Sequence, residues 1–248
     1  MSRTPTLIIA TLTLAAASVG FGQTFTVTTN ADAGAGTLRQ AILDANAFGG
    51  AATINLSAGL GTITLGRELP VLLNPAGITI NGNGNTIDGG STSNSTGYRV
   101  FFVGVSDDIA SVSPGLNATN ATPWAISNLN IRNANARGGN GGNGGIGAGG
   151  GAGLGGAIFV NAGELTLSGV TFADNRAVGG NGGTQFQGTF GGGGGGGMGG
   201  HGGNADNGLR PGGGGGGFGG GAGGAVFVRQ GASVVFVDGG LTGGRVQG

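Results

Sequence analysis

The chain has 248 residues, of which 66 are glycine and only 8% are charged, and its formal net charge is zero. Its basic residues are scattered, which excludes nucleic acid binding, and it has no cysteine, which excludes disulfides and thiolate metal sites. Disordered chains combine high net charge with low hydrophobicity, but apolar residues make up 38% of this one. The composition therefore predicts ordered, strand-like segments that alternate with glycine tracts.

Residues 1–22 have the features of a secretory signal peptide. Arg3 supplies a basic start, an apolar run covers residues 7–19, and Gly22 is a small residue suited to a cleavage site. The apolar run is too short for a comfortable membrane span, and no later segment could span a membrane as a helix. We therefore expect an exported protein that begins at Gln23 and has no transmembrane segment after the signal is removed.

Residues 23–50 are predicted to form a strand and a capping helix. The alternating sequence TFTVTT, rich in threonine and valine, is typical of a strand. The sequence TLRQAILDAN predicts a short helix, with Thr37 as its N-cap. An apolar face of this helix needs a surface to cover, and it consists of Leu38, Ala41, Ile42 and Ala45.

Residues 51–248 consist of short strands closed by glycine or asparagine, without an apparent second helix. The strand segments are ATINL, GTITL, GITINGNGNTIDGG, YRVFFVGV, WAISNLNIRN, GGAIFV, ELTLSGVTF, GGAVFV and ASVVFV. Many short strands without helices exclude an ordinary α/β sheet and favour an all-β or solenoid fold.

One internal comparison favours the solenoid. When residues 125–139 are placed over residues 166–180, the apolar positions coincide and Asn128 falls on Gly169. Glycine and asparagine best tolerate a left-handed backbone, so a sharp corner recurs together with the apolar pattern. The coinciding apolar pairs are Ile126 with Leu167, Leu129 with Val170 and Ile131 with Phe172.

Two glycine tracts, at about 138–156 and 179–224, are predicted to be insertions at one corner of the solenoid. They carry few apolar side chains, so they cannot offset the entropy of ordering by ordinary burial. Two alternatives remain at this point: flexible loops, or polyglycine-like sheets that stack and hydrogen-bond to each other.

The motifs resemble a known family. GGAI at Gly155–Ile158 and FADN at Phe172–Asn175 resemble the paired GGAI and FxxN motifs of polymorphic outer-membrane, autotransporter-like repeat proteins. The opening FTVTTNADAGAGTLRQAILDANA is similar to the N-terminal segment of bacterial surface proteins with right-handed parallel β-helices, and ITINGNGNTIDGG resembles their first full rung. The resemblance covers residues 24–248 and implies a right-handed parallel β-helix with a short N-terminal capping helix.

The second GGA(I/V) copy is GGAV and lacks a following FxxN, and neither a barrel nor a C-terminal anchoring signal is recognisable in the sequence. We therefore expect the β-helix to be incomplete at its C-terminus, with any membrane anchor in a missing C-terminal part.

Parallel β-helices also serve as polysaccharide lyases and hydrolases, so an enzyme is the alternative. NTID at Asn85–Asp88, the pair Asp107–Asp108 and GHG at Gly200–Gly202 imitate the motifs of galacturonan hydrolases, but their spacing is wrong and NTID has an extra residue. The carboxylates are too dispersed to predict a lyase or a calcium roll. The sequence predicts no catalytic, cofactor-binding or metal-ligating residue.

Several single residues are predicted to have structural roles. His201 is predicted to be a solvated loop residue, and Trp124 to pack in the core, with a sugar-stacking platform as the alternative. Asn175 is predicted to bond the backbone at a corner. Six phenylalanines are predicted to stack in the interior: Phe101, Phe102, Phe159, Phe172, Phe227 and Phe236.

The resulting expectation is a secreted, non-enzymatic protein of the bacterial cell surface, associated with the outer membrane and adhesin-like or structural. Its partners would be surface glycans or host and matrix proteins.

Overall fold

The computed structural model describes residues 22–104, 122–145, 147–184, 196, 201–202 and 221–247. These residues form one helix and parallel β-sheets, as the all-β prediction requires. No helix in this part of the chain is long and apolar enough to cross a membrane. The proposed signal peptide lies outside the described residues, apart from Gly22.

The strands form five parallel sheets, numbered here by size and position. Sheet 1 contains β1 (Gln23–Val27), β2 (Ala52–Leu56), β4 (Ile78–Asn81), β7 (Pro123–Ser127), β12 (Glu164–Ser168) and β17 (Ser233–Phe236). Sheet 2 contains β3 (Thr62–Thr64), β5 (Thr86–Asp88), β8 (Asn130–Arg132), β13 (Val170–Ala173) and β18 (Gly239–Thr242). Sheet 3 contains β6 (Phe101–Val103), β11 (Ile158–Val160) and β16 (Val226–Val228). Sheet 4 contains β9 (Asn135–Arg137), β14 (Arg176–Val178) and β19 (Arg245–Gln247), and sheet 5 contains β10 (Gly153–Leu154) and β15 (Gly221–Ala222).

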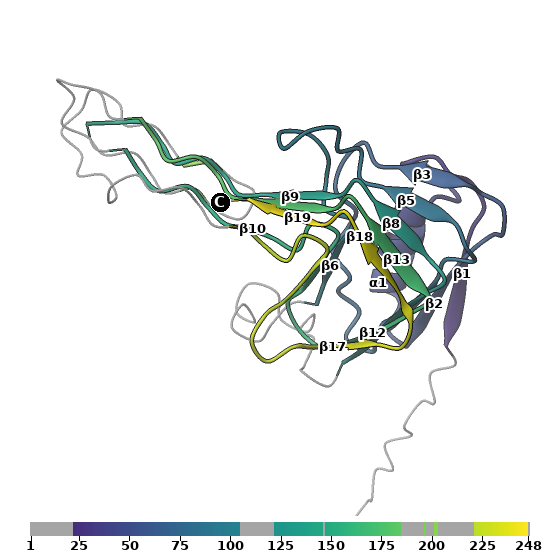
Figure 1. Ribbon diagram of the computed structural model, residues 1–248. Helices are drawn as coiled ribbons and strands as arrows, with labels where there is room; N and C mark the ends of the chain where they lie inside the picture. The colour runs from purple at the N-terminus through teal and green to yellow at the C-terminus, as the bar shows by residue number, and fades with distance from the viewer. Residues whose placement is uncertain are drawn as a thin grey trace, which may run out of the picture.

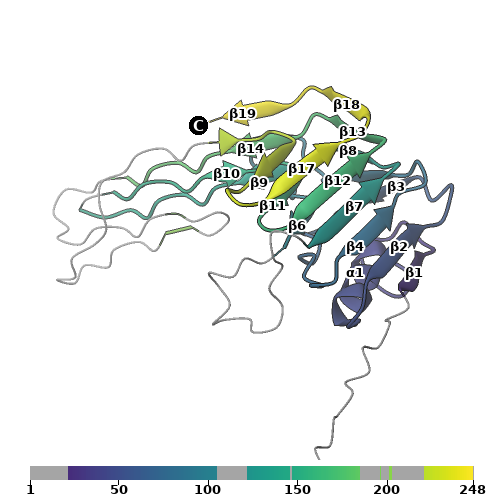
Figure 2. The same cartoon turned by 90° about the horizontal axis from the view of Figure 1, so that it is seen from below.

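The chain visits these sheets in a repeating order. From β7 it passes through sheets 2, 4, 5 and 3 before β12 returns to sheet 1, and from β12 it follows the same order to β17. Equivalent strands of successive circuits therefore lie side by side, as the row of sheet 1 strands in Figure 2 shows.

The strand register confirms the internal repeat. Ile126 is paired with Leu167, and Ile131 with Phe172. The corner residues also match, because Asn128 has a φ of 50° and Gly169 a φ of 61°, both left-handed. The two GGA(I/V)FV segments are likewise paired in register, as β11 and β16.

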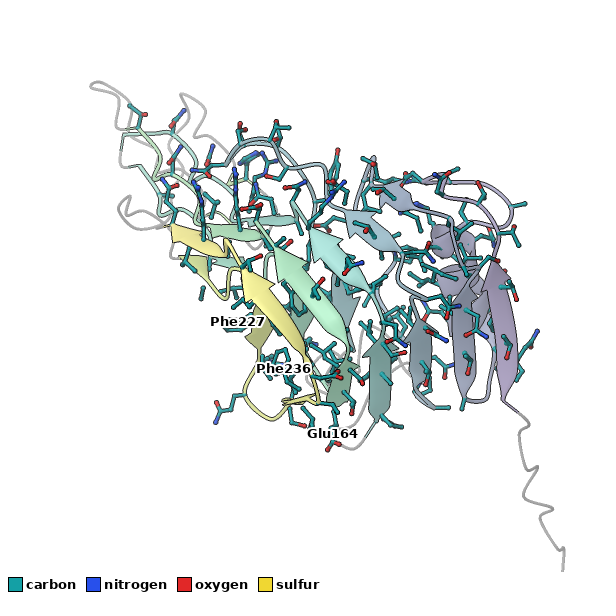
Figure 3. All side chains as sticks on the ribbon, turned by 45° about the vertical axis from the view of Figure 1, so that its right-hand side comes forward. Glu164, Phe227 and Phe236 are labelled. Atoms are coloured by element: carbon teal, nitrogen blue, oxygen red, sulfur yellow. The ribbon has the colours of Figure 1, made fainter. Side chains whose placement is uncertain are left out.

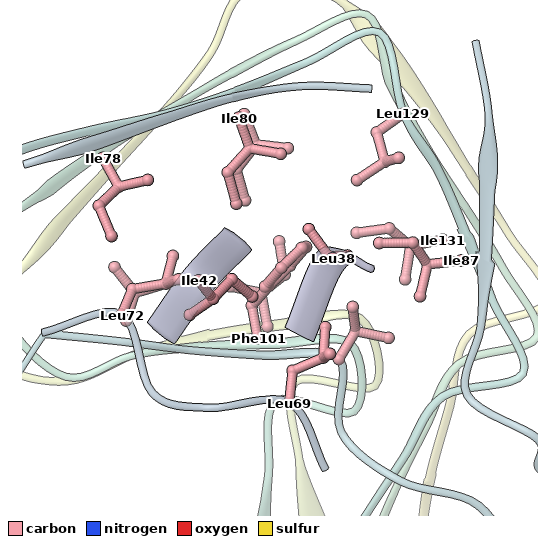
Figure 4. Packing of buried hydrophobic residues seen from close by; sticks show 14 of the residues in the cluster. Leu38, Ile42, Leu69, Leu72, Ile78, Ile80, Ile87, Phe101, Leu129 and Ile131 are labelled. Atoms are coloured by element: carbon pink, nitrogen blue, oxygen red, sulfur yellow. The ribbon is translucent and has the colours of Figure 1, made fainter. Parts of the chain in front are cut away.

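Identical or similar apolar residues of sheets 1, 2 and 3 stack from one circuit to the next and form the core (Figure 4). One such row in sheet 1 runs Ile54, Ile80, Ile126 and Leu167, and one in sheet 2 runs Ile63, Ile87, Ile131 and Phe172. Every member of both rows is at most 3% exposed. Burial of these rows is the main driving force for stacking the circuits.

The helix α1 (Leu38–Ala47) covers the N-terminal end of the core (Figures 2 and 4). Thr37 caps it by accepting a hydrogen bond from the Gln40 N–H at 3.2 Å, and Leu38 and Ile42 are fully buried. The helix prediction is confirmed in its cap and its apolar face. Arg39 adds a tie that the sequence did not suggest, since its guanidinium bonds Asp32 at 2.6 Å and the Glu68 carbonyl at 2.5 Å.

Buried asparagines join successive circuits. The Asn175 side chain, 1% exposed, accepts from the Ala134 N–H at 3.0 Å and donates to the Ile131 carbonyl at 3.0 Å. Asn85 links Ser57 and Gly61 in the same manner, at 2.9 and 3.0 Å. The predicted backbone-bonding role of Asn175 is confirmed.

The glycine tracts build a projection from the side of the sheets, here called the glycine blade, whose described residues are 138–145, 147–155, 179–184, 196, 201–202 and 221–224 (Figure 1). In the described part, backbone hydrogen bonds connect its segments. Gly138, Gly141 and Gly144 donate to the carbonyls of Val178, Asn181 and Thr184 at 2.8, 2.7 and 3.1 Å. The described tracts are thus hydrogen-bonded layers, which favours the second of the two alternatives.

The blade has a repeat of three residues, the repeat of a polyproline II helix. Its donors recur at this interval, and so do the glycines at which an added Cβ would collide with a neighbouring backbone: Gly138, Gly141, Gly147, Gly150 and Gly153. Gly150, for example, faces the Gly180 carbonyl oxygen. Glycine is required here because the backbones approach too closely for any side chain.

The structure differs from the sequence prediction in several details. Phe102, Phe159 and Phe227 do stack on one another, with ring centroids 4.8 and 5.4 Å apart, but outside the main core cluster; Phe159 is buried there at 2% exposed, and Phe102 and Phe227 are only partly buried. Side chains alternate between the two faces of a strand, and Ile158 and Val160, on either side of Phe159, belong to the main core cluster. ITINGNGNTIDGG forms β4 and β5, and it is followed by β6, the first strand of sheet 3; the preceding β2 and β3 pair with β4 and β5. The strands of sheets 4 and 5 and β18 were also missed.

Phe236 was predicted to be interior and is 59% exposed. It is paired with the fully buried Leu167, but no described strand covers the other edge of β17. Figure 3 shows it with Phe227 at the C-terminal end of the stack.

The first prediction concerns Asn175. Asn175→Ala should destabilise the protein by about 1–3 kcal/mol, because it leaves the Ala134 N–H and the Ile131 carbonyl buried without partners. Denaturant unfolding measures this loss. Asn55→Ala is the control, because this side chain on β2 is partly exposed and has no hydrogen-bond partner among the described residues. An unchanged midpoint for Asn175→Ala would contradict the assigned role.

The second prediction concerns the blade. Gly150→Ala should separate the layers around Gly180 and accelerate amide hydrogen exchange at Gly151 and Gly180, at a cost of about 1–3 kcal/mol. Gly244→Ala is the matched control, since an added Cβ there meets nothing within 4 Å. Equal exchange rates in the two variants would argue against close layer packing.

Candidate functional site

A groove with a volume of about 690 Å³ lies beside the root of the glycine blade. Its floor comes from sheet 4, one wall from the loop of residues 93–98, and the other from the blade. The groove is therefore assembled from three segments that are distant in the sequence.

The floor consists of residues aligned across three circuits. Arg137, Val178 and Gln247 end β9, β14 and β19 and are in register with one another. Because strands stack in this direction, the floor runs across the strands of sheet 4.

The loop wall is held in place by groups of sheet 4. The side-chain amide of Asn135, which is 2% exposed, donates to three carbonyl oxygens of this segment. These acceptors belong to Ser93 at 3.4 Å, Asn94 at 3.1 Å and Thr96 at 2.7 Å. Arg137 donates to the Ser95 carbonyl, and Asn94 donates to the Gln247 side chain. The wall is thus fixed to the floor.

The blade wall is a row of polar residues, one from each of three hydrogen-bonded segments of the blade. The Asn140 side chain accepts from the Asn181 N–H at 2.9 Å, and the Asn140 N–H donates to His201 Nδ1 at 2.8 Å. Since Nδ1 is an acceptor, the neutral His201 ring carries its proton on Nε2. Asn140, Asn181 and His201 are therefore held by the blade while remaining exposed.

The groove is polar and nearly balanced in charge. Its ionisable lining residues are Glu68, Arg137, His201 and Tyr98. Tyr98 is 36% exposed, and within the described structure its hydroxyl and the Asn181 side chain show no hydrogen-bond partner. These groups are available to a ligand that both donates and accepts hydrogen bonds.

Arg99 stabilises the junction behind this groove. Its side chain is 7% exposed, bonds the Leu154 carbonyl at 3.0 Å and the Gly155 carbonyl at 3.2 Å, and lies 5.7 Å from the Phe102 ring centroid and 5.6 Å from that of Phe159. Burial lowers the pKa of the Arg99 guanidinium, and Glu68, 3.9 Å away, opposes this shift. Arg99 thus connects the blade, the aromatic row and the groove.

The structure gives the surroundings of Trp124, His201 and Asp88, three residues that the sequence analysis discusses. Trp124 is 1% exposed and donates its Nε1–H to the Ala162 carbonyl at 3.1 Å, so it is a core residue and no sugar platform. His201 is exposed, as predicted, but it also accepts a blade hydrogen bond. Asp88 forms an ion pair with Arg132 at 2.8 Å, a structural contact.

Of the residues in the enzyme-like motifs, Asp107, Asp108 and Gly200 lie outside the described residues. Among the residues that are described, no three His, Asp or Glu side chains are grouped so that they could hold a metal ion.

Sequence reasoning missed Tyr98, Asn140 and Asn181 as parts of one surface. A usable signal was present in GGNGGNGG at 138–145 and GGNGG at 179–183, where a larger residue follows every two glycines. That spacing matches a threefold helix and could have aligned Asn140 with Asn181. No sequence signal places Tyr98 opposite them.

A second groove, of about 520 Å³, lies at the C-terminal end of the stack and is apolar. Phe236, Leu241 and Val228 line it, and they are 59%, 66% and 37% exposed. It exists because β16, β17 and β18 are paired on one edge only among the described strands.

The third prediction tests the Arg99 junction. Arg99→Met should destabilise the protein by about 2–4 kcal/mol, because two carbonyls lose their donor and the cation–π contacts disappear. Denaturant unfolding measures the change, with the exposed Arg67→Met as the control. Equal loss in both variants would show that Arg99 has no special role.

Comparison of the chain with protein-family models, with curated proteins and with solved structures finds no match.

Proposed function

We propose that the chain forms a right-handed parallel β-helix that is exported to the bacterial cell surface, where it acts as a non-enzymatic, adhesin-like or structural protein. The repeating visit to sheets 1, 2, 4, 5 and 3 supports the β-helix, because each circuit places its strands beside those of the previous one. Parallel crossover connections are right-handed in nearly all proteins, which supports the handedness.

The glycine blade is the observation that carries this proposal. It extends a hydrogen-bonded layer structure away from the sheets, and Arg99 fixes its root at Leu154 and Gly155 (Figure 1). A rigid projection increases the surface that a protein can present to a partner without a large apolar core. Such a part suits contact with another surface.

The carboxylates support a non-enzymatic role. Asp32, Glu68 and Asp88 each lie within 4.0 Å of an arginine, at 2.6, 3.9 and 2.8 Å. Hydrolysis of a glycosidic bond needs two carboxyl groups that face each other across the bond. The acids named here are engaged in folding contacts instead.

The fourth prediction tests export and the lack of turnover together. When the whole chain is expressed in a Gram-negative host, we expect processing before Gln23 and recovery outside the inner membrane, measured by N-terminal sequencing and cell fractionation. The purified protein should release no reducing sugar and no unsaturated product from a polysaccharide panel.

Retention in the cytoplasm would contradict the surface role, and clear turnover of a polysaccharide would replace it with an enzymatic one. A preparation heated until it unfolds serves as the control for background sugar release.

A further inference from the structure

We infer that the polar groove beside the glycine blade is a binding site for a neutral oligosaccharide. This inference deepens the proposed function and rests on it, since it assigns the adhesive contact to one surface. It is carried by the fixed walls of the groove, its side-chain amides, its balanced charge and the exposed ring of Tyr98.

Both walls are fixed before any ligand arrives. Asn135 bonds three carbonyls of the loop wall, and Asn140 bonds both Asn181 and His201 in the blade wall. A preformed site avoids the entropy cost of ordering its own side chains on binding. This matters for a sugar, because sugar hydroxyls gain little net free energy from exchanging water for protein.

The available groups match vicinal hydroxyls. A side-chain amide donates from nitrogen and accepts at oxygen, and a sugar hydroxyl does both as well. Asn181 offers its whole amide, Asn140 its amide nitrogen, and the neutral His201 its Nε2–H. They form one row because Asn140 is bonded to the other two.

The charge balance favours a neutral glycan over an acidic one. Arg137 and Glu68 are opposite charges on the groove, and Arg137 already donates to the Ser95 carbonyl. Binding of a polyanion would call for an excess of arginine or lysine with free donors. The groove has no such excess among its described lining residues.

Tyr98 supplies the apolar part of the site. The residue is 36% exposed and lines the same groove as Asn140 and Asn181. A tyrosine combines an apolar face with a polar tip, which suits the C–H face of a sugar ring and its hydroxyl edge. The volume of about 690 Å³ lies within the range of small-molecule sites.

The fifth prediction is tested by isothermal titration calorimetry on the whole chain. The probes are neutral linear hexasaccharides of glucose (β-1,4 and α-1,4), xylose and mannose, and anionic hexasaccharides of galacturonate and heparin. We expect at least one neutral probe to bind. Tyr98→Ala and Asn181→Ala should each weaken that binding roughly tenfold, a loss of about 1.4 kcal/mol.

Two variants control for folding and for general surface change. Leu43→Ala removes an exposed apolar side chain on α1, 47% exposed, and should bind as the unaltered chain does. Tyr98→Phe keeps the ring and should retain most of the affinity. Thermal unfolding of Asn181→Ala and Tyr98→Phe should match that of the unaltered chain, because neither substitution removes a described hydrogen bond. Tyr98→Ala removes the buried part of the ring and should unfold at a lower temperature while staying folded at the titration temperature.

The outcomes separate this inference from the proposed function. Binding of anionic probes alone, binding of no probe, or full affinity in both Tyr98→Ala and Asn181→Ala would overturn the groove assignment. The last of these results would leave an adhesive role at another surface intact. Binding at the groove with turnover of the bound sugar would overturn the non-enzymatic role and leave the site assignment standing.

Discussion

The in-register parallel pairing of each circuit with the next is the constraint on which the rest of this structure depends. It places like residues above like residues, so that Ile54, Ile80, Ile126 and Leu167 form one buried row. A shift by one residue would turn such a row to the opposite face of the sheet. The left-handed corners at Asn128 and Gly169 keep this register through successive turns.

The glycine blade extends the same pairing with a different repeat. Sheet 4 leads directly into it, since Gly138 donates to the Val178 carbonyl at the end of β14. Within the blade the interval changes from two residues to three, and hydrogen bonds replace apolar burial as the contact between layers. Glycine makes this feasible because a Cβ at Gly150 would force the backbones apart.

The polar groove lies where sheet 4 meets the glycine blade. Sheet 4 supplies aligned side chains, the blade supplies a row of polar residues, and Asn135 draws the loop of residues 93–98 against them. Arg99 holds the junction from behind, with its charge satisfied by backbone carbonyls and by the aromatic faces of Phe102 and Phe159. A surface role would thus use a junction that backbone hydrogen bonds and aromatic contacts both hold.

The sequence by itself determined the strand segments of the core, the capping helix with Thr37, the repeat of residues 125–139 in 166–180 and the structural role of Asn175, because each depends on local periodicity or on the chemistry of a single residue. It did not predict which phenylalanines belong to the main core cluster, since neighbouring strand residues such as Ile158 and Phe159 point to opposite faces of the sheet. The layer packing of the glycine tracts and the meeting of Tyr98 with Asn140 and Asn181 were decided by the tertiary structure alone. These depend on hydrogen bonds between segments about 40 residues or more apart, which the stacking of circuits brings together and which no local pattern encodes.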